Sequence, residues 1–148
     1  MPRAPFQVLV FPFRRNVDQI EYAVFRRADN NNWQAIAGGG EDEETPLQAA
    51  GREAFEEAEI PASKQLIPLS SMATVPVVHI CGFAWGEDVR VVPEYCFGVN
   101  VTGVDLAISH EHVELCWTDY AHATSLLRWD SNKNALWELD FLLRKGDA

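Results

Sequence analysis

The 148-residue chain has few basic residues, few cysteines and no long hydrophobic run. Lys and Arg together number 12 against 22 Asp and Glu, which gives a formal net charge of −10. Because nucleic-acid polymers select basic surfaces, this charge argues against DNA or RNA as a partner. No segment approaches a membrane span, and the short apolar run at 6–13 is broken by Pro12 and suits a strand better than a signal peptide. We therefore expect no membrane partner.

Cysteine is scarce, and its spacing carries no chemical pattern. Cys81, Cys96 and Cys116 lie far apart, without a Cys-x-x-Cys pair. An odd, unpatterned set argues against a disulfide framework and predicts reduced thiols packed in a core. We therefore expect a cytoplasmic protein.

Composition and hydrophobic patterning predict one folded domain over residues 1–148. Hydrophobic residues make up 47% of the chain, which argues against disorder, and the sequence contains no repeat. We expect strands over residues 6–14, 20–27 (paired around a turn at 16–18), 33–37, 70–80, 89–101 and 115–117, helices over 46–58 and 119–127, a last helix capped by Asp130 or Ser131 that runs to 145, and a mobile loop over 81–88. This order predicts an α+β fold in which helices cover a mixed sheet.

The helix expected over residues 46–58 has clear start signals. Thr45 and Gln48 form a Thr-x-x-Gln capping box, and Pro46 suits the first helical position. Gly51 and Phe55 lie at the flank of an apolar stripe that we expect to face the core. The stripe consists of Leu47, Ala50, Ala54 and Ala58.

The C-terminal half of this helix carries an acidic cluster on another face. Glu53, Glu56 and Glu57 are neighbours at helical spacing, and Arg52 is the basic residue beside them. Acids are disfavoured at this end of a helix because the macrodipole is negative there. A bound divalent cation would reverse the balance, and all-oxygen ligation suits Mg²⁺. The alternative is a solvated acidic face.

The residues around the cluster follow a longer pattern. Its spacing resembles the signature of the Nudix hydrolases, Gly-x5-Glu-x7-Arg-Glu-U-x-Glu-Glu-x-Gly-U, where U is aliphatic. The matching residues are Gly38, Glu44, Arg52, Glu53, Glu56, Glu57 and Ile60. Ala54 is a small occupant of the first aliphatic position, and Glu59 replaces the late Gly. The departure concerns the turn that ends the helix, whereas the acidic face is intact.

This resemblance implies an α/β/α sandwich with a mixed sheet and a catalytic set on the helix. Glu53, Glu56 and Glu57 would hold Mg²⁺, with Mn²⁺ as a substitute, and one carboxylate would activate water. Arg52 and Glu44 would form an ion pair that orients the metal-binding acids. The alternative for that pair is an ordinary surface bridge. Because metal ions would turn the acids into an anion site, we expect an absolute metal requirement.

A closer similarity is to the dihydroneopterin triphosphate diphosphatase subfamily, also described as dATP pyrophosphohydrolases. It is carried by Arg26-Arg27, Trp33-Gln34, Glu94-Tyr95-Cys96-Phe97, Glu111-His112 before Trp117, and a C-terminal helix with Trp and Asn.

This similarity implies that Glu111 is a further metal ligand, although an exposed loop acid is the alternative. Zinc held by His110, His112 and Cys116 is a rival interpretation, which the surplus of carboxylates disfavours. Glu94 would assist as a further ligand or base, unless it is simply an exposed residue.

Other residues are candidates for substrate contact. Arg26 or Arg27 would grip a phosphate, since guanidinium suits bidentate contacts. Trp33 would stack on a base or pterin ring, unless it packs in the core. Gly38 and Gly39 would let the backbone approach phosphates, although a tight turn alone also explains them.

The sequence therefore predicts a Mg²⁺-dependent pyrophosphohydrolase that cleaves a nucleoside or pterin triphosphate to the monophosphate and pyrophosphate. A dinucleoside polyphosphate hydrolase, suggested by the Trp33-Gln34 pair, is the alternative. A non-catalytic nucleotide-binding module is a third possibility, disfavoured because every box carboxylate is present. No pattern indicates an oligomeric state.

Overall fold

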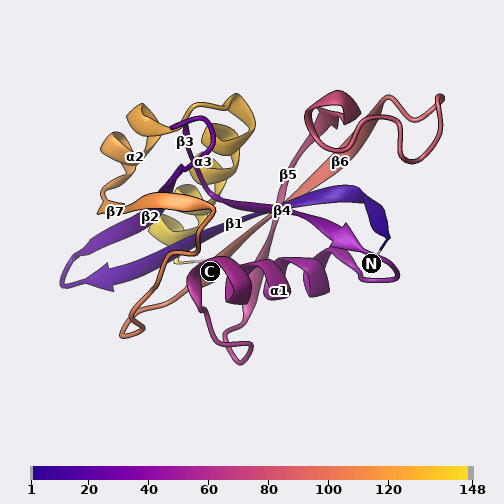
Figure 1. Ribbon diagram of the computed structural model, residues 1–148. Helices are drawn as coiled ribbons and strands as arrows, with labels where there is room; N and C mark the ends of the chain where they lie inside the picture. The colour runs from indigo at the N-terminus through magenta and orange to yellow at the C-terminus, as the bar shows by residue number, and fades with distance from the viewer. Residues whose placement is uncertain (1, 147–148) are drawn as a thin grey trace.

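The computed structural model describes residues 2–146, which form one mixed sheet with helices on both faces (Figure 1). The elements in chain order are β1 (Arg3–Asn16), β2 (Gln19–Arg27), β3 (Trp33–Gln34), β4 (Ile36–Glu41), α1 (Pro46–Ala58), β5 (Leu66–Pro76), a short 3-10 helix (Val77–His79), β6 (Val91–Asn100), β7 (His112–Thr118), α2 (Tyr120–Leu126) and α3 (Asp130–Lys145). The predicted α+β class and mixed sheet are confirmed.

The first strand is the centre of the sheet. The strand order is β3-β2-β1-β6-β5, with β4 added to β1 and β7 added to β2. β1 runs antiparallel to β2 and β4 and parallel to β6. Its middle is apolar at every position because both of its faces are covered, with Val8 and Val10 toward one core and Leu9 and Phe11 toward the other.

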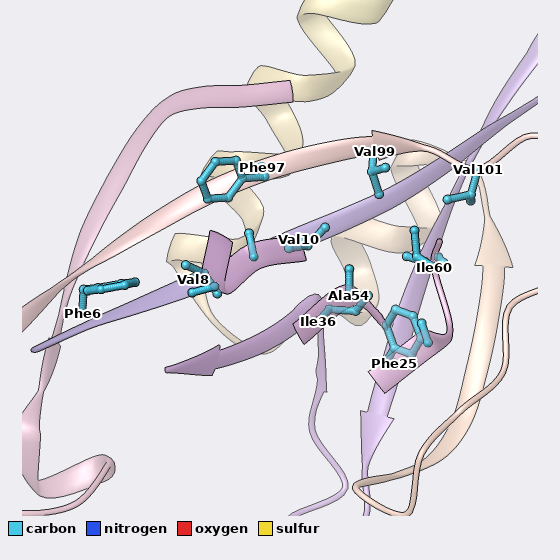
Figure 2. Close-up of a cluster of buried hydrophobic side chains, with 14 of the residues drawn as sticks. Phe6, Val8, Val10, Phe25, Ile36, Ala54, Ile60, Phe97, Val99 and Val101 are labelled. Carbon is cyan, nitrogen blue, oxygen red and sulfur yellow. The ribbon is translucent and has the colours of Figure 1, made fainter. Parts of the chain in front are cut away.

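Two hydrophobic cores lie on the two faces of the sheet. α1 covers one face, and α2 and α3 cover the opposite face (Figure 1). Figure 2 shows the α1 side, where Ala54 of the helix and Ile60 beyond it meet Val8, Val10 and Phe25 of the sheet. This arrangement confirms the α/β/α sandwich.

The helix bounds predicted for residues 46–58 are confirmed, together with the capping box between Thr45 and Gln48. The predicted core stripe is wrong at one position, because Leu47 is 51% exposed. Ala49 and the acidic Glu57 are buried in its place. Alanines dominate the buried face because only a small side chain lets the helix lie directly against the sheet.

Several strand and cap predictions need correction. The single strand expected over residues 33–37 is two strands, β3 and β4. The glycines at 38–40, expected to follow that strand, lie inside β4. The strand expected over 70–80 begins earlier and ends in the 3-10 helix. Trp129 precedes the first residue of α3 without a side-chain cap bond, so Asp130 and Ser131 lie inside the helix instead of capping it.

The loop over residues 81–88 is attached to the body of the protein. The indole Nε1 of Trp85 donates to the carbonyl oxygen of Arg3 at 2.7 Å. Cys81, Cys96 and Cys116 are all free thiols, as predicted, and Cys96 is buried. Within residues 2–146, no helix has the length and apolar character needed to cross a membrane.

Candidate functional site

The residues of the Nudix-like pattern converge where β4 lies against α1. Gly38 faces the helix, and a methyl group added there would overlap the carboxyl group of Glu53. Gly40 faces the same core, and a methyl group there would overlap the ring of Phe6. Gly39 faces the opposite side of the sheet, near the Gln7 amide. The missing side chains at Gly38 and Gly40 let the strand lie directly on the helix carboxylate and the core ring.

Arg52 fastens the loop before α1 to the helix. Its Nε and Nη2 atoms donate to the two carboxylate oxygens of Glu44 at 2.8 and 3.0 Å, and Nη2 also donates to the Gly39 carbonyl at 2.9 Å. Glu44 in turn accepts from the backbone N–H of Glu41 at 2.8 Å. The predicted ion pair is therefore present. The hydrogen bond from Arg52 holds the pKa of Glu44 below its usual range.

The same guanidinium also contacts the acids of the cluster. Arg52 Nη1 lies 3.0 Å from Glu53 Oε1 and 3.2 Å from Glu56 Oε2. No three His, Cys, Asp or Glu side chains within residues 2–146 already form a metal-ligand group. In this conformation Arg52 supplies the positive charge that Glu53 and Glu56 require, which leaves Glu57 without a cationic partner.

Glu57 is the most buried acid of the cluster. Its side chain is 1% exposed, whereas that of Glu56 is 53% exposed. Both carboxylate oxygens of Glu57 lack a hydrogen-bond partner among the described residues. The pKa of Glu57 is raised to about 10, chiefly by burial and in addition by the nearby carboxylates of Glu53 and Glu111. The helix face predicted for the cluster therefore divides into one exposed acid, one intermediate acid and one buried acid.

This donor set fits a hard divalent cation. Unpartnered oxygens buried beside a second carboxylate are costly unless a cation or a proton neutralises them. All of the donors are carboxylate oxygens, which Mg²⁺ and Mn²⁺ accept readily. Glu53 and Glu57 would hold the ion, and Glu56, whose side chain is 53% exposed, would contribute from the solvent side.

His112 is the residue of this site that sequence reasoning assigned differently. Its Nε2 atom lies 3.5 Å from Glu57 Oε1, and its side chain is fully buried. The rival zinc interpretation with His110, His112 and Cys116, already disfavoured, is excluded because His112 faces α1 whereas Cys116 packs in the core on the other side of the sheet. The sequence signal that could have identified His112 is its neighbour Glu111, because the Glu111-His112 pair carries the resemblance that implies a metal ligand there.

Glu111 lies in the loop before β7. The loop is anchored to the end of β2, because the Glu111 carbonyl accepts from the backbone N–H of Ala28 at 2.9 Å. Its exposed side chain acts electrostatically on Glu57 and on Arg27. The structure thus places Glu111 close enough to the acidic cluster to influence Glu57 electrostatically. The role of Glu111 as a metal ligand stays a prediction.

The two arginines predicted to grip a phosphate differ in their surroundings. Arg26 is paired with Glu114 at 3.1 Å and with Asn31 at 2.7 Å. Arg27 makes two contacts of 3.0 Å with Asp29, and its charge lowers the pKa of Glu57. Arg27 is therefore the arginine nearer to the cluster in its electrostatic effect.

Trp33 and Glu94 belong to the other side of the sheet. Trp33 is half-buried against the core that α2 and α3 cover. Glu94 pairs in register with Gln7 of β1 and faces the same side as Leu9 and Cys96. The suggestion that Glu94 assists as a metal ligand or base is therefore wrong, since the sheet separates it from Glu53 and Glu57.

Comparison with known proteins gives consistent results. The NUDIX domain family matches residues 5–138. The chain is 41% identical to a solved NUDIX hydrolase of Listeria monocytogenes, with a TM-score of 0.90 and 97% of each chain covered. The Escherichia coli dihydroneopterin triphosphate pyrophosphohydrolase has a TM-score of 0.77 at 22% identity, covering 95% of this chain and 99% of that chain. Dihydroneopterin triphosphate diphosphatase of Haemophilus influenzae is 23% identical over 141 residues, which is 93% of this chain and 89% of that protein.

Proposed function

The chain belongs to the NUDIX domain family and is a hydrolase of phosphoric anhydride bonds, and we propose that it uses Mg²⁺ to cleave a nucleoside or pterin triphosphate to the monophosphate and pyrophosphate. The similarity to the dihydroneopterin triphosphate diphosphatase supports the substrate class. The free thiols favour a reducing compartment, so we place the protein in the cytoplasm.

One observation carries the proposal. Glu57 is a buried carboxylate whose two oxygens find no hydrogen-bond donor among the described residues, and it stands beside Glu53, whose carboxyl group lies against Gly38. A structural acid in a core is normally satisfied by hydrogen bonds. An unsatisfied acid next to a second acid is instead suited to binding a cation, which the reaction needs.

The residues of the chain divide the chemistry among them. When bound, Mg²⁺ neutralises phosphate charge and makes water a better nucleophile. Glu53, Glu56 and Glu57 would hold the ion, with Glu111 as a further ligand from the opposite loop. A carboxylate of this set accepts the proton of the attacking water. Arg52 and Glu44 fix the position of the loop before α1 relative to the helix. Arg27 is the candidate for binding a substrate phosphate.

A substrate panel tests the proposal directly. Purified protein with Mg²⁺ should release pyrophosphate from dATP or from dihydroneopterin triphosphate, and it should release none after chelation of the metal. Release of orthophosphate alone, or turnover of no triphosphate, contradicts the proposal.

Diadenosine tetraphosphate in the same panel tests the alternative function. If it competes with dATP and is cleaved faster, the dinucleoside polyphosphate hydrolase is favoured. Tight metal-dependent nucleotide binding without turnover would indicate the non-catalytic module.

Glu57→Gln tests the assignment of the buried acid. The variant keeps the shape of the side chain but removes its charge, so kcat should fall by more than the roughly 10–100-fold that loss of a ligand's supporting partner costs. Glu59→Gln removes an exposed acid at the end of the same helix and should leave kcat unchanged. Equal activity of the two variants refutes the role of Glu57.

A further inference from the structure

His112 and Glu57 face each other inside the protein without other polar partners. Neither ring nitrogen of His112 and neither carboxylate oxygen of Glu57 has a hydrogen-bond partner among the described residues. The exposed fractions of the two side chains are 0% and 1%, and Nε2 and Oε1 are 3.5 Å apart. Leaving four buried polar atoms unsatisfied is costly, so the juxtaposition calls for an explanation.

A β-bulge directs His112 toward the helix. β7 pairs with β2 so that Glu114 is opposite Arg26 and His112 is opposite Arg27, which leaves Val113 as an extra residue. In a regular strand without the bulge, His112 would lie two residues before Glu114, share its face and point away from α1. Bulges of this kind commonly re-aim one side chain near a functional site.

The surroundings of the ring restrict its orientation. The ring packs against Phe25 with centroids 5.2 Å apart and an interplanar angle of 44°. The backbone N–H of His112 donates to the Ser109 carbonyl at 3.1 Å, while the preceding residue is anchored to Ala28. The backbone of His112 is therefore fixed by hydrogen bonds of the loop and its ring by packing against Phe25, so that Nε2 points toward Glu57.

We propose that His112 is a positioning residue for Glu57. Its Nε2–H donates to Oε1, which leaves Oε2 available to the divalent cation. A displacement of about 0.3 Å or more brings the present separation into the hydrogen-bond range of about 2.7–3.2 Å. The bond also couples Glu57 on α1 to the loop that carries Glu111, so that both acids are presented together. The inference rests on the proposed function insofar as that function requires a cation at Glu57.

Manganese binding by the substrate-free protein tests the proposal. His112→Leu keeps an apolar side chain but removes the donor, and it should weaken Mn²⁺ binding, measured by electron paramagnetic resonance of free Mn²⁺, by about 10–100-fold. His112→Gln places an amide N–H near the position of Nε2 and should restore most of the affinity. Val113→Ala, at the exposed neighbouring position, should bind Mn²⁺ as the wild type does.

Two outcomes overturn the inference. One is wild-type Mn²⁺ affinity in His112→Leu, and the other is an equal loss in the Leu and Gln variants, which would point to packing alone. Thermal melting of each variant shows whether it folds.

A measurement on the wild-type protein covers the case in which the Leu variant does not fold. Nitrogen NMR of the imidazole in the presence of Mg²⁺ should show a proton on Nε2, and a proton on Nδ1 alone overturns the proposal. Failure of the proposed function would be recognised separately, because the wild type would then bind no Mn²⁺ at all.

Discussion

Gly38 of β4 lies so close to the Glu53 carboxyl group that a single added methyl would occupy the same space. The neighbour that would be displaced is the far end of a flexible side chain, not the backbone. Function and stability can therefore be separated at this position, in contrast to Gly40, where the obstacle is the buried ring of Phe6.

Gly38→Ala should fold but lose activity. The Glu53 carboxylate would rotate away, so we expect a large loss of kcat and of Mn²⁺ affinity with a nearly unchanged melting temperature. Gly51→Ala is the matched control, because its new methyl would find no atom nearer than Leu66 at 4.0 Å. That control should raise stability by about 0.5–1 kcal/mol, since Ala favours a helix more than Gly does. An active Gly38→Ala enzyme would show that the position of Glu53 is unimportant.

Arg52→Lys should disable the connection between loop and helix while preserving charge. Lysine cannot reproduce the two-pronged contact with Glu44 together with the bond to the Gly39 carbonyl. We expect a loss of about 1–3 kcal/mol in the free energy of unfolding, measured in urea, and a clear fall in kcat. Arg144→Lys, at a side chain that is 68% exposed and makes one bond to Asp140, should change the free energy of unfolding little and leave kcat intact. Similar results for both variants would contradict a special role for Arg52.

Glu138 should make stability depend on pH in the acidic range. This carboxylate of α3 accepts from the backbone N–H groups of Ser70 and Ser71, both at 2.7 Å, and from the Ser71 hydroxyl at 2.6 Å. Burial opposes ionisation, but these bonds outweigh it and lower the pKa of Glu138 from its ordinary value of 4.5. Because the pKa of Glu138 is lower in the folded state than in the unfolded state, the ionised carboxylate stabilises the protein above pH 4.5. This stabilisation is lost as the pH falls through the pKa of the folded state.

Glu138→Gln should therefore destabilise the protein by about 1–3 kcal/mol at neutral pH, and by less in acid. Urea unfolding of both proteins at neutral pH and well below pH 4.5 measures the difference. Glu43→Gln, at an exposed loop position, should show no such change. If the difference in unfolding free energy between the wild type and Glu138→Gln were the same at both pH values, the lowered pKa of Glu138 would be contradicted.

Glu59→Gly should stabilise the protein without changing activity. Glu59 ends α1 in the left-handed conformation, with φ 57° and ψ 36°, and its N–H bonds back to the last turn. This conformation suits Gly, so we expect a gain of about 0.5–1 kcal/mol in the free energy of unfolding, with kcat unchanged. The substitution restores the Gly of the Nudix pattern, and a loss of stability would show that the Glu59 side chain makes a compensating contact.

The sequence was sufficient for α1 and the Arg52–Glu44 pair because their signals are local. Thr45, Pro46 and Gln48 determine the start of the helix through contacts within its first turn. The spacing of Glu44 and Arg52 within one loop-helix segment leaves little freedom for either side chain.

The position of His112 and the face occupied by Glu94 depended on strand pairing instead. The extra residue Val113 has no compositional signature, because a bulge is defined only against the partner strand. Glu94 was placed by its register with Gln7, which lies far away in sequence. The exposure of Leu47 likewise follows from how α1 sits on the sheet and not from the helical period.

The central position of β1 has a consequence for how the protein is made. Its apolar strand is synthesised well before its parallel partner β6, which spans residues 91–100 and must leave the ribosome before that edge is paired. At about 5–20 residues per second, the exposed edge persists for seconds during translation. β2 and β4 protect other parts of β1 sooner, so the half-made chain is most open to misassociation along the side reserved for β6. We therefore expect the pairing of β6 with β1, and not the formation of α1, to be the step at which newly made chains are most prone to misassociate.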